Sequence, residues 1–180
     1  WSYAELSRRS DQVANWLLGL GLGRGSHVIV MLNNCIELWE VVLAIYKIGA
    51  VAIPTSTLLS AADLAYRAEY GEAQAVVLPS SLHARTQLLP SRVLRIGVGP
   101  TVPAGWTDWR QSLRPSDIFT PDGPTPATDP SLLYFTSGTT SRPKLVRHTQ
   151  VSYPVGHLST MWWLGVRPGD VHLNISSPGW

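Results

Sequence analysis

Hydrophobic and polar positions in the first half of the chain alternate between helical and strand spacing. Ser2 and Glu5, three residues apart, form the capping box that begins a helix. The apolar positions that follow at helical spacing are Leu6, Val13, Leu17 and Leu20. Next come an apolar run at 27–32, an apolar helix that Gly49 ends, and a second strand at 50–54. The order strand, helix, strand favours parallel pairing through a right-handed crossover.

The same alternation continues along the chain. Asn34 and Glu37 predict a side-chain cap for the second helix. A third helix is expected at 60–71, where Ser60 and Asp63 occupy the cap and third positions. The remaining expected elements are a strand at 75–78, a short helix at 82–89, and strands at 93–98, 132–135 and 145–148, followed by a helix at 152–164 and a strand at 171–176. The pattern predicts an α/β fold with a partly parallel sheet flanked by helices.

Residues 100–130 break the pattern, because seven prolines interrupt any long element there. At most a short helix at 106–113 fits, with Trp106 and Trp109 as packing anchors. We therefore divide the chain into a first β-α-β sheet region (1–99), a proline-rich connector (100–131) and the start of a nucleotide-binding region (132–180).

Composition narrows the function classes. Fourteen Lys and Arg against twelve Asp and Glu, without a run of like charges, give nucleic-acid binding no support. The one cysteine, Cys35, excludes an internal disulfide, fits a reducing compartment and is interpreted as a small buried residue. No apolar run approaches the length of a membrane span, and no signal peptide is present, so we expect a cytoplasmic protein. Both ends read as cut, which predicts a fragment of a longer chain.

The candidate binding site is the loop 136–144, which follows the apolar run 132–135. Gly138 lets successive backbone N–H groups face one concavity, Lys144 adds charge, and the hydroxyl donors are Thr136, Ser137, Thr139, Thr140 and Ser141. A Walker A loop is excluded, because Pro143 stands where that motif has glycine and Leu145 where it has serine or threonine. Phosphate binding and a simple hydroxyl-rich surface turn are both compatible with this composition.

Residues 134–144 resemble the AMP-binding signature of the adenylate-forming superfamily, which includes acyl-CoA synthetases, peptide-synthetase adenylation domains and luciferases. The chain departs from the usual pattern at Ser141, where glycine is common. Residues 46–54 resemble a second segment of the same superfamily. The sequence is most similar to acetyl- and medium-chain acyl-CoA synthetases, which also have a Gly-Trp pair like Gly179-Trp180.

This resemblance implies the N-terminal part of the large domain of an acid-thiol ligase. Such an enzyme activates a carboxylic acid, here a fatty acid, with Mg²⁺ and ATP, and transfers the acyl group to coenzyme A. By resemblance, the phosphate ligands are Thr136, Ser137, Gly138, Thr139, Thr140 and Lys144. Trp180 is either near the acyl site or an ordinary buried aromatic. Catalytic residues and metal ligands of the family lie beyond this chain, so we expect it to be inactive alone.

Two alternatives remain open at this stage. The first is an adenylation domain that loads a carrier protein. The second is a non-catalytic nucleotide-binding relative, which Ser141 in place of glycine favours.

Overall fold

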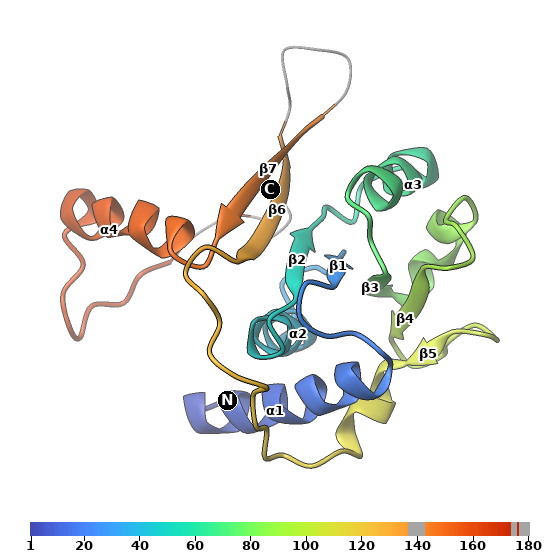
Figure 1. The fold of residues 1–180 in the computed structure, drawn as a ribbon, viewed down its shortest axis with the longest axis horizontal. Coiled ribbons are helices and arrows are strands. Elements are labelled where there is room, and N and C mark those ends of the chain that lie inside the picture. The colour runs from blue at the N-terminus through green and yellow to red at the C-terminus, as the bar shows by residue number, and fades with distance from the viewer. Residues whose placement is uncertain (137–142, 174–175, 177–180) are drawn as a thin grey trace.

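The computed structural model describes residues 1–136, 143–173 and 176. Its described residues form a seven-stranded sheet in the order β5-β4-β3-β1-β2-β6-β7 (Figure 1). The strands are β1 (His27–Val30), β2 (Val51–Pro54), β3 (Ala75–Pro79), β4 (Leu94–Val98), β5 (Thr107–Asp108), β6 (Pro130–Thr136) and β7 (Lys144–Thr149). All neighbouring strands run parallel except β6 and β7, which form an antiparallel pair. The predicted α/β class with a mostly parallel sheet flanked by helices is confirmed.

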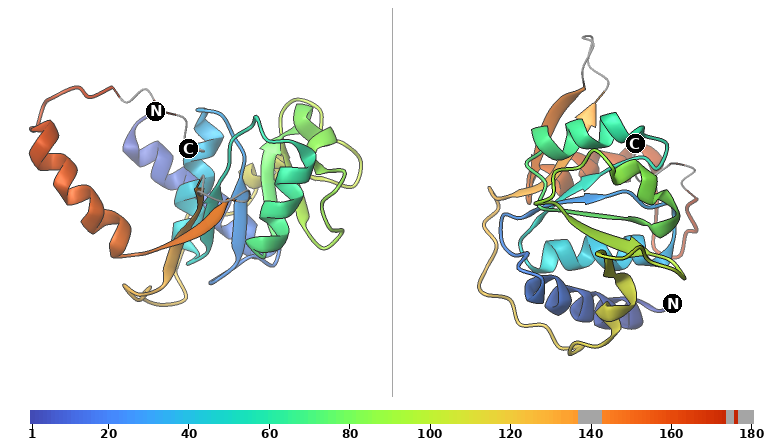
Figure 2. Two further views of the ribbon diagram at one scale, coloured as in Figure 1. Left: turned by 90° about the horizontal axis from the view of Figure 1, so that it is seen from above. Right: turned by 90° about the vertical axis from the view of Figure 1, so that its right-hand side faces the viewer.

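Helices cover both faces of this sheet, as the edge-on view in Figure 2 shows. The helices are α1 (Tyr3–Gly19), α2 (Ile36–Lys47), α3 (Ala61–Tyr70) and α4 (Ser152–Leu164), with 3-10 turns η1 (Ser80–Thr86) and η2 (Trp109–Leu113). Because successive strand side chains point to opposite faces, Val28 and Val30 pack against α1 and α2, while Ile29 packs in the cluster that contains residues of α3. Both faces of the central strands are therefore buried, which explains their continuous apolar sequences.

The first helix begins where the capping box predicts. The Ser2 hydroxyl accepts a hydrogen bond from the Glu5 backbone N–H at 3.2 Å, and the Ser2 backbone N–H donates to the Glu5 carboxylate at 2.7 Å. At the far end of α2, Lys47 lies in the last turn and its Nζ lies 2.6 Å from an oxygen of Asp11 on α1. Lys47 thus fastens the two helices that cover one face of the sheet.

The proline-rich connector lies along α1. Asn15 donates from its amide nitrogen to the backbone oxygens of Ser116 and Ile118 at 2.8 and 2.9 Å. Arg24 forms an ion pair with Asp122, at 2.5 Å, before the chain enters β6. The Trp109 ring is buried against Trp16, with the ring centroids 5.6 Å apart. These contacts hold an extended segment that has few backbone hydrogen bonds of its own.

Three local predictions differ from the structure. The cap of α2 is Cys35 without a side-chain hydrogen bond, because the Asn34 side-chain oxygen accepts instead from the Trp39 indole at 3.2 Å. Cys35 itself is half-buried against the core. The short helix predicted at 82–89 is the 3-10 turn η1, which begins and ends earlier. The strand predicted at 171–176 is wrong for its described residues, 171–173 and 176, which have no regular secondary structure.

The last helix lies at the margin of the molecule (Figure 1). Its bounds, Ser152–Leu164, match the prediction, and Gly165 ends it with φ +64°. No residue of α4 is buried, and Trp162 and Trp163 are 86% and 73% exposed. The helix therefore owes its bounds to local sequence rather than to an apolar face packed on the sheet.

Candidate functional site

The candidate phosphate loop joins two paired strands. Thr136 is the last residue of β6 and Lys144 the first of β7, and the two are partners in the antiparallel ladder. The Thr136 hydroxyl donates to the Lys144 backbone oxygen at 3.5 Å. The strand pair therefore fixes both ends of the loop at the edge of the sheet where the parallel strands end. Ligand sites of open α/β sheets commonly lie at this edge.

The predicted site residues divide into two groups. Thr136 and Lys144 are described, and both are exposed. The predicted residues that lie outside the described ranges are Ser137, Gly138, Thr139, Thr140 and Trp180. A hydroxyl whose hydrogen bond to the strand partner is long, and an ammonium group on the opposite strand, fit an anion such as a phosphate, which can accept hydrogen bonds from both.

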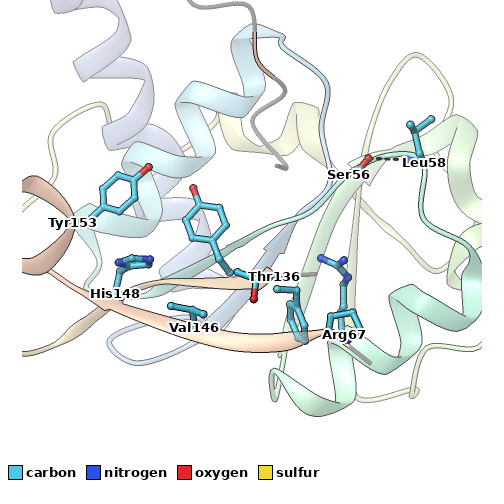
Figure 3. A pocket seen from close by; sticks show the side chains of 10 residues that line it. Ser56, Leu58, Arg67, Thr136, Val146, His148 and Tyr153 are labelled. Carbon is cyan, nitrogen blue, oxygen red and sulfur yellow. Dashed lines mark hydrogen bonds between the residues drawn. The ribbon is translucent and has the colours of Figure 1, made fainter. Parts of the chain in front are cut away.

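A cavity of about 660 Å³ opens beside the two ends of the loop (Figure 3). Its walls come from the segment after β2, from α3, from the β6–β7 pair and from the start of α4. The lining residues are Ser56, Leu58, Arg67, Tyr134, Phe135, Thr136, Pro143, Val146, His148 and Tyr153. Small-molecule sites have this size and this mixture of aromatic walls with few polar groups.

One wall of the cavity is aromatic. The Tyr153 ring lies 5.4 Å from His148 and 6.3 Å from Tyr134, measured between centroids. Burial, followed by a hydrogen bond with Tyr153, raises the pKa of Tyr134 above its usual range. A tyrosine is already protonated at physiological pH, and the raised pKa keeps the Tyr134 phenol a hydrogen-bond donor to still higher pH.

The opposite wall carries a cation. Arg67 of α3 lies over the Phe135 ring, with its guanidinium carbon 4.9 Å from the ring centroid. Phe135 also lies 6.2 Å, between centroids, from each of Tyr66 and Tyr70. Burial lowers the pKa of Arg67, although an arginine stays charged in proteins. An apolar platform thus holds a positive charge at the cavity wall.

Sequence reasoning missed this wall. Ser56, Arg67, His148 and Tyr153 belong to none of the motifs found in the sequence. Arg67 meets Phe135 because β2, which precedes α3, lies beside β6 in the sheet. No local sequence pattern predicts that strands so far apart in the chain lie side by side.

Tyr46 behind the aromatic wall gives a pH prediction. Burial, with a smaller contribution from Tyr153, raises the pKa of Tyr46 from 10.0 to about 12. The folded protein therefore holds the Tyr46 proton more tightly than the unfolded chain does. The resulting contribution to the free energy of unfolding is complete below pH 10 and is lost as the pH rises towards 12. We expect the phenolate absorbance titration of Tyr46→Phe, subtracted from that of the wild type, to be centred at about 12. A difference curve centred near 10, the ordinary tyrosine value, would contradict the burial.

The described ranges contain neither a membrane-spanning helix nor a cluster of metal-ligating side chains. Within 1–136, 143–173 and 176, no helix is both long and apolar enough to cross a membrane. In the same residues, no three or more His, Cys, Asp or Glu side chains gather as a metal ligand set would.

Known proteins are similar to this chain in sequence and in fold. The chain is 33% identical to human acyl-coenzyme A synthetase ACSM5, mitochondrial, over 186 aligned residues that cover 100% of the chain and 32% of the relative. It is 36% identical to 4-hydroxybutyrate–CoA ligase 1 of Metallosphaera sedula, covering 99% of the chain and 31% of that ligase. The chain thus spans about a third of the length of these curated relatives.

Solved structures agree with the sequence matches. The crystal structure of an acyl-CoA synthetase from Brucella canis superposes with a TM-score of 0.86 and 25% identity, over 99% of this chain and 33% of that one. A likeness of this quality extends through the sheet, the connector and the strand pair that holds the loop. The model of the family described as "AMP-binding enzyme" matches residues 1–180, the whole chain, and the protein therefore belongs to the AMP-binding enzyme family.

Proposed function

We propose that this chain is part of an ATP-dependent acyl-CoA synthetase. In that reaction a carboxylate oxygen attacks the α-phosphorus of ATP, and pyrophosphate leaves as the acyl-adenylate forms. The thiol of coenzyme A then attacks the acyl carbon, and AMP leaves. The observation that carries the proposal is the strand pair that holds both ends of the loop, in a chain whose curated relatives are named as CoA ligases and synthetases.

The loop 136–144 would bind the phosphates. The donors that we propose are Thr136, Ser137, Gly138, Thr139 and Thr140, with Lys144 as the cation. The described ends fit this role, because Thr136 lines the cavity with a hydroxyl and its strand partner Lys144 is exposed with an ammonium group. Fixed donors aimed at developing phosphate charge supply electrostatic stabilisation without reorganisation.

Magnesium and the acid complete the proposal. Mg²⁺ would enter with ATP, since this ion binds phosphate oxygens and keeps several waters rather than requiring a protein cage. A fatty acid is the substrate class that we propose, and Trp180 would stand near it. The cytoplasmic location stays a prediction, and so does the division at 1–99, 100–131 and 132–180.

The test is ATP–pyrophosphate exchange by the full-length protein with short, medium and aromatic carboxylic acids and with amino acids. We expect exchange with a fatty acid, and release of AMP that depends on coenzyme A. Exchange with an amino acid and transfer to a carrier protein would instead identify an adenylation domain. Absence of exchange with every acid would contradict the proposal and favour a non-catalytic relative.

The 180 residues alone are expected to show no exchange. By resemblance to the family, further contacts to the carboxylate, the ribose and the metal would be needed to align the acid and the nucleotide for in-line attack. Exchange by the purified 180-residue chain above a no-protein blank would contradict this expectation.

A further inference from the structure

Arg67 is a half-buried cation whose donors have no acceptor among the described residues. No described carboxylate lies within 4.0 Å of it, although seven such ion pairs join other described residues. No described group accepts a hydrogen bond from its guanidinium, which lies over the Phe135 ring. An arginine has five N–H donors in a fixed fork, and such donors are normally satisfied when they are partly buried.

The remaining residues do not supply an acidic partner. None of the side chains at 137–142, 174–175 and 177–180 carries a carboxylate. The nearest acid on its own helix is Asp63, whose carboxylate accepts a hydrogen bond from the Ser60 hydroxyl at 2.6 Å at the start of α3. Asp63 interacts with Arg67 electrostatically but forms no ion pair with it, so the N–H donors of the guanidinium are left for an anion that enters the cavity.

The position of Arg67 indicates which anion. Its side chain points into the same cavity as Thr136 and Pro143, the described residues that border the loop (Figure 3). Ser56 adds a hydroxyl to this wall, and its oxygen accepts from the Leu58 backbone N–H at 3.2 Å, which leaves the hydroxyl hydrogen free to donate. Phosphate groups suit a planar guanidinium, which can bind two oxygens at once.

We propose that Arg67 is an additional phosphate ligand that binds the pyrophosphate end of the nucleotide from the wall opposite the loop. The stack on Phe135 fixes the plane of the guanidinium and leaves its N–H edges directed into the cavity. This inference rests on the proposed function, because it assigns the same cavity to the nucleotide. Coenzyme A also carries phosphates, and the experiment distinguishes the two sources.

The experiment is calorimetric titration of the full-length protein in the presence of Mg²⁺, with inorganic pyrophosphate and, separately, with coenzyme A. We expect Arg67→Ala to weaken pyrophosphate binding about tenfold, the usual loss for a charge-assisted hydrogen bond. The pyrophosphate affinity of Arg67→Lys should lie between those of the wild type and Arg67→Ala, because lysine keeps the charge but cannot bind two oxygens in one plane. The matched control is Arg92→Ala, which removes the same charge from an exposed ion pair with Glu69 and should stay within about twofold of the wild type.

Each result decides the inference. Pyrophosphate affinity of Arg67→Ala within about twofold of the wild type would overturn it, as would a loss confined to titrations with coenzyme A. If Arg67→Ala fails to fold, Arg67→Lys decides in the same way: weaker binding supports the assignment and equal binding overturns it. No pyrophosphate binding by the wild type would overturn it as well.

Failure of the inference and failure of the proposed function are separable. If the wild type shows exchange activity and Arg67→Ala binds pyrophosphate as tightly as the wild type, the proposed enzyme class stands and the role of Arg67 is refuted. If Arg67→Ala loses pyrophosphate affinity but the wild type shows exchange with no acid, the phosphate site stands and the proposed synthetase activity is refuted.

Discussion

Replacing Lys144 with alanine in the full-length protein is expected to slow ATP–pyrophosphate exchange about 100-fold, the usual cost of removing one stabilising donor from a reacting charge. Lys144 begins β7 directly opposite Thr136, so its position is set by a backbone ladder rather than by the loop. Its ammonium group would neutralise charge that builds on the departing pyrophosphate. The loss should fall mainly on kcat, because this charge develops in the transition state.

Stability should change little, which separates this role from a structural one. Lys144 is exposed, and no ion pair of the described residues includes it. We expect the free energy of unfolding to fall by less than about 0.5 kcal/mol. Arg147→Ala is the control, since it removes one charge from the same strand at an exposed position three residues away. Equal exchange rates in Lys144→Ala and the wild type would refute the assigned role.

The sequence predicts those features whose determinants are local. The capping box at Ser2 and Glu5, the cap at Ser60 and the positive φ of Gly49 mark helix ends where the structure has them. The bounds of α4 are also predicted, although none of its residues is buried. Short-range hydrogen bonds and backbone preferences therefore suffice to specify these helix ends.

Features that depend on a competing partner or on distant residues were not predicted. The side chain of Asn34 could cap α2 by its spacing, but the Trp39 indole competes for the same oxygen. The neighbours of β2 are β1 and β6, and the second of these follows only after α3, two further strands and the connector. The sequence predicts the strands but not their order in the sheet. It therefore predicts the loop of the site but not the cavity wall that carries Arg67.

The connector shows the same division. Its prolines predict irregular structure, and the structure has only β5 and η2 there. Its path is set by side chains of α1 such as Asn15, which donate to backbone oxygens more than one hundred residues away in the chain. A polar residue on a helix surface looks like a solvated position until its partner is known.

The largest stability effect is expected at the ion pair of Arg9 and Glu40, which joins α1 to α2. The Arg9 Nε and Nη2 donate to the two oxygens of Glu40 at 3.0 and 3.1 Å, and the Arg9 and Glu40 side chains are only 11% and 3% exposed. Arg9 also donates to the backbone oxygen of Ser112 in η2 at 3.3 Å. The pair therefore connects both helices of one layer to the connector.

Glu40→Ala should lower the free energy of unfolding by about 3–5 kcal/mol, because it leaves the Arg9 charge buried and unpaired. Urea denaturation followed by circular dichroism measures this loss. The double variant Arg9→Met with Glu40→Leu should recover most of the stability, since apolar side chains of similar volume avoid the desolvation of two charges. The exposed pair of Arg92 and Glu69 is the control, and Glu69→Ala should cost less than about 1 kcal/mol. Equal losses of unfolding free energy in Glu40→Ala and Glu69→Ala would show that burial does not strengthen the contribution of the Arg9–Glu40 pair.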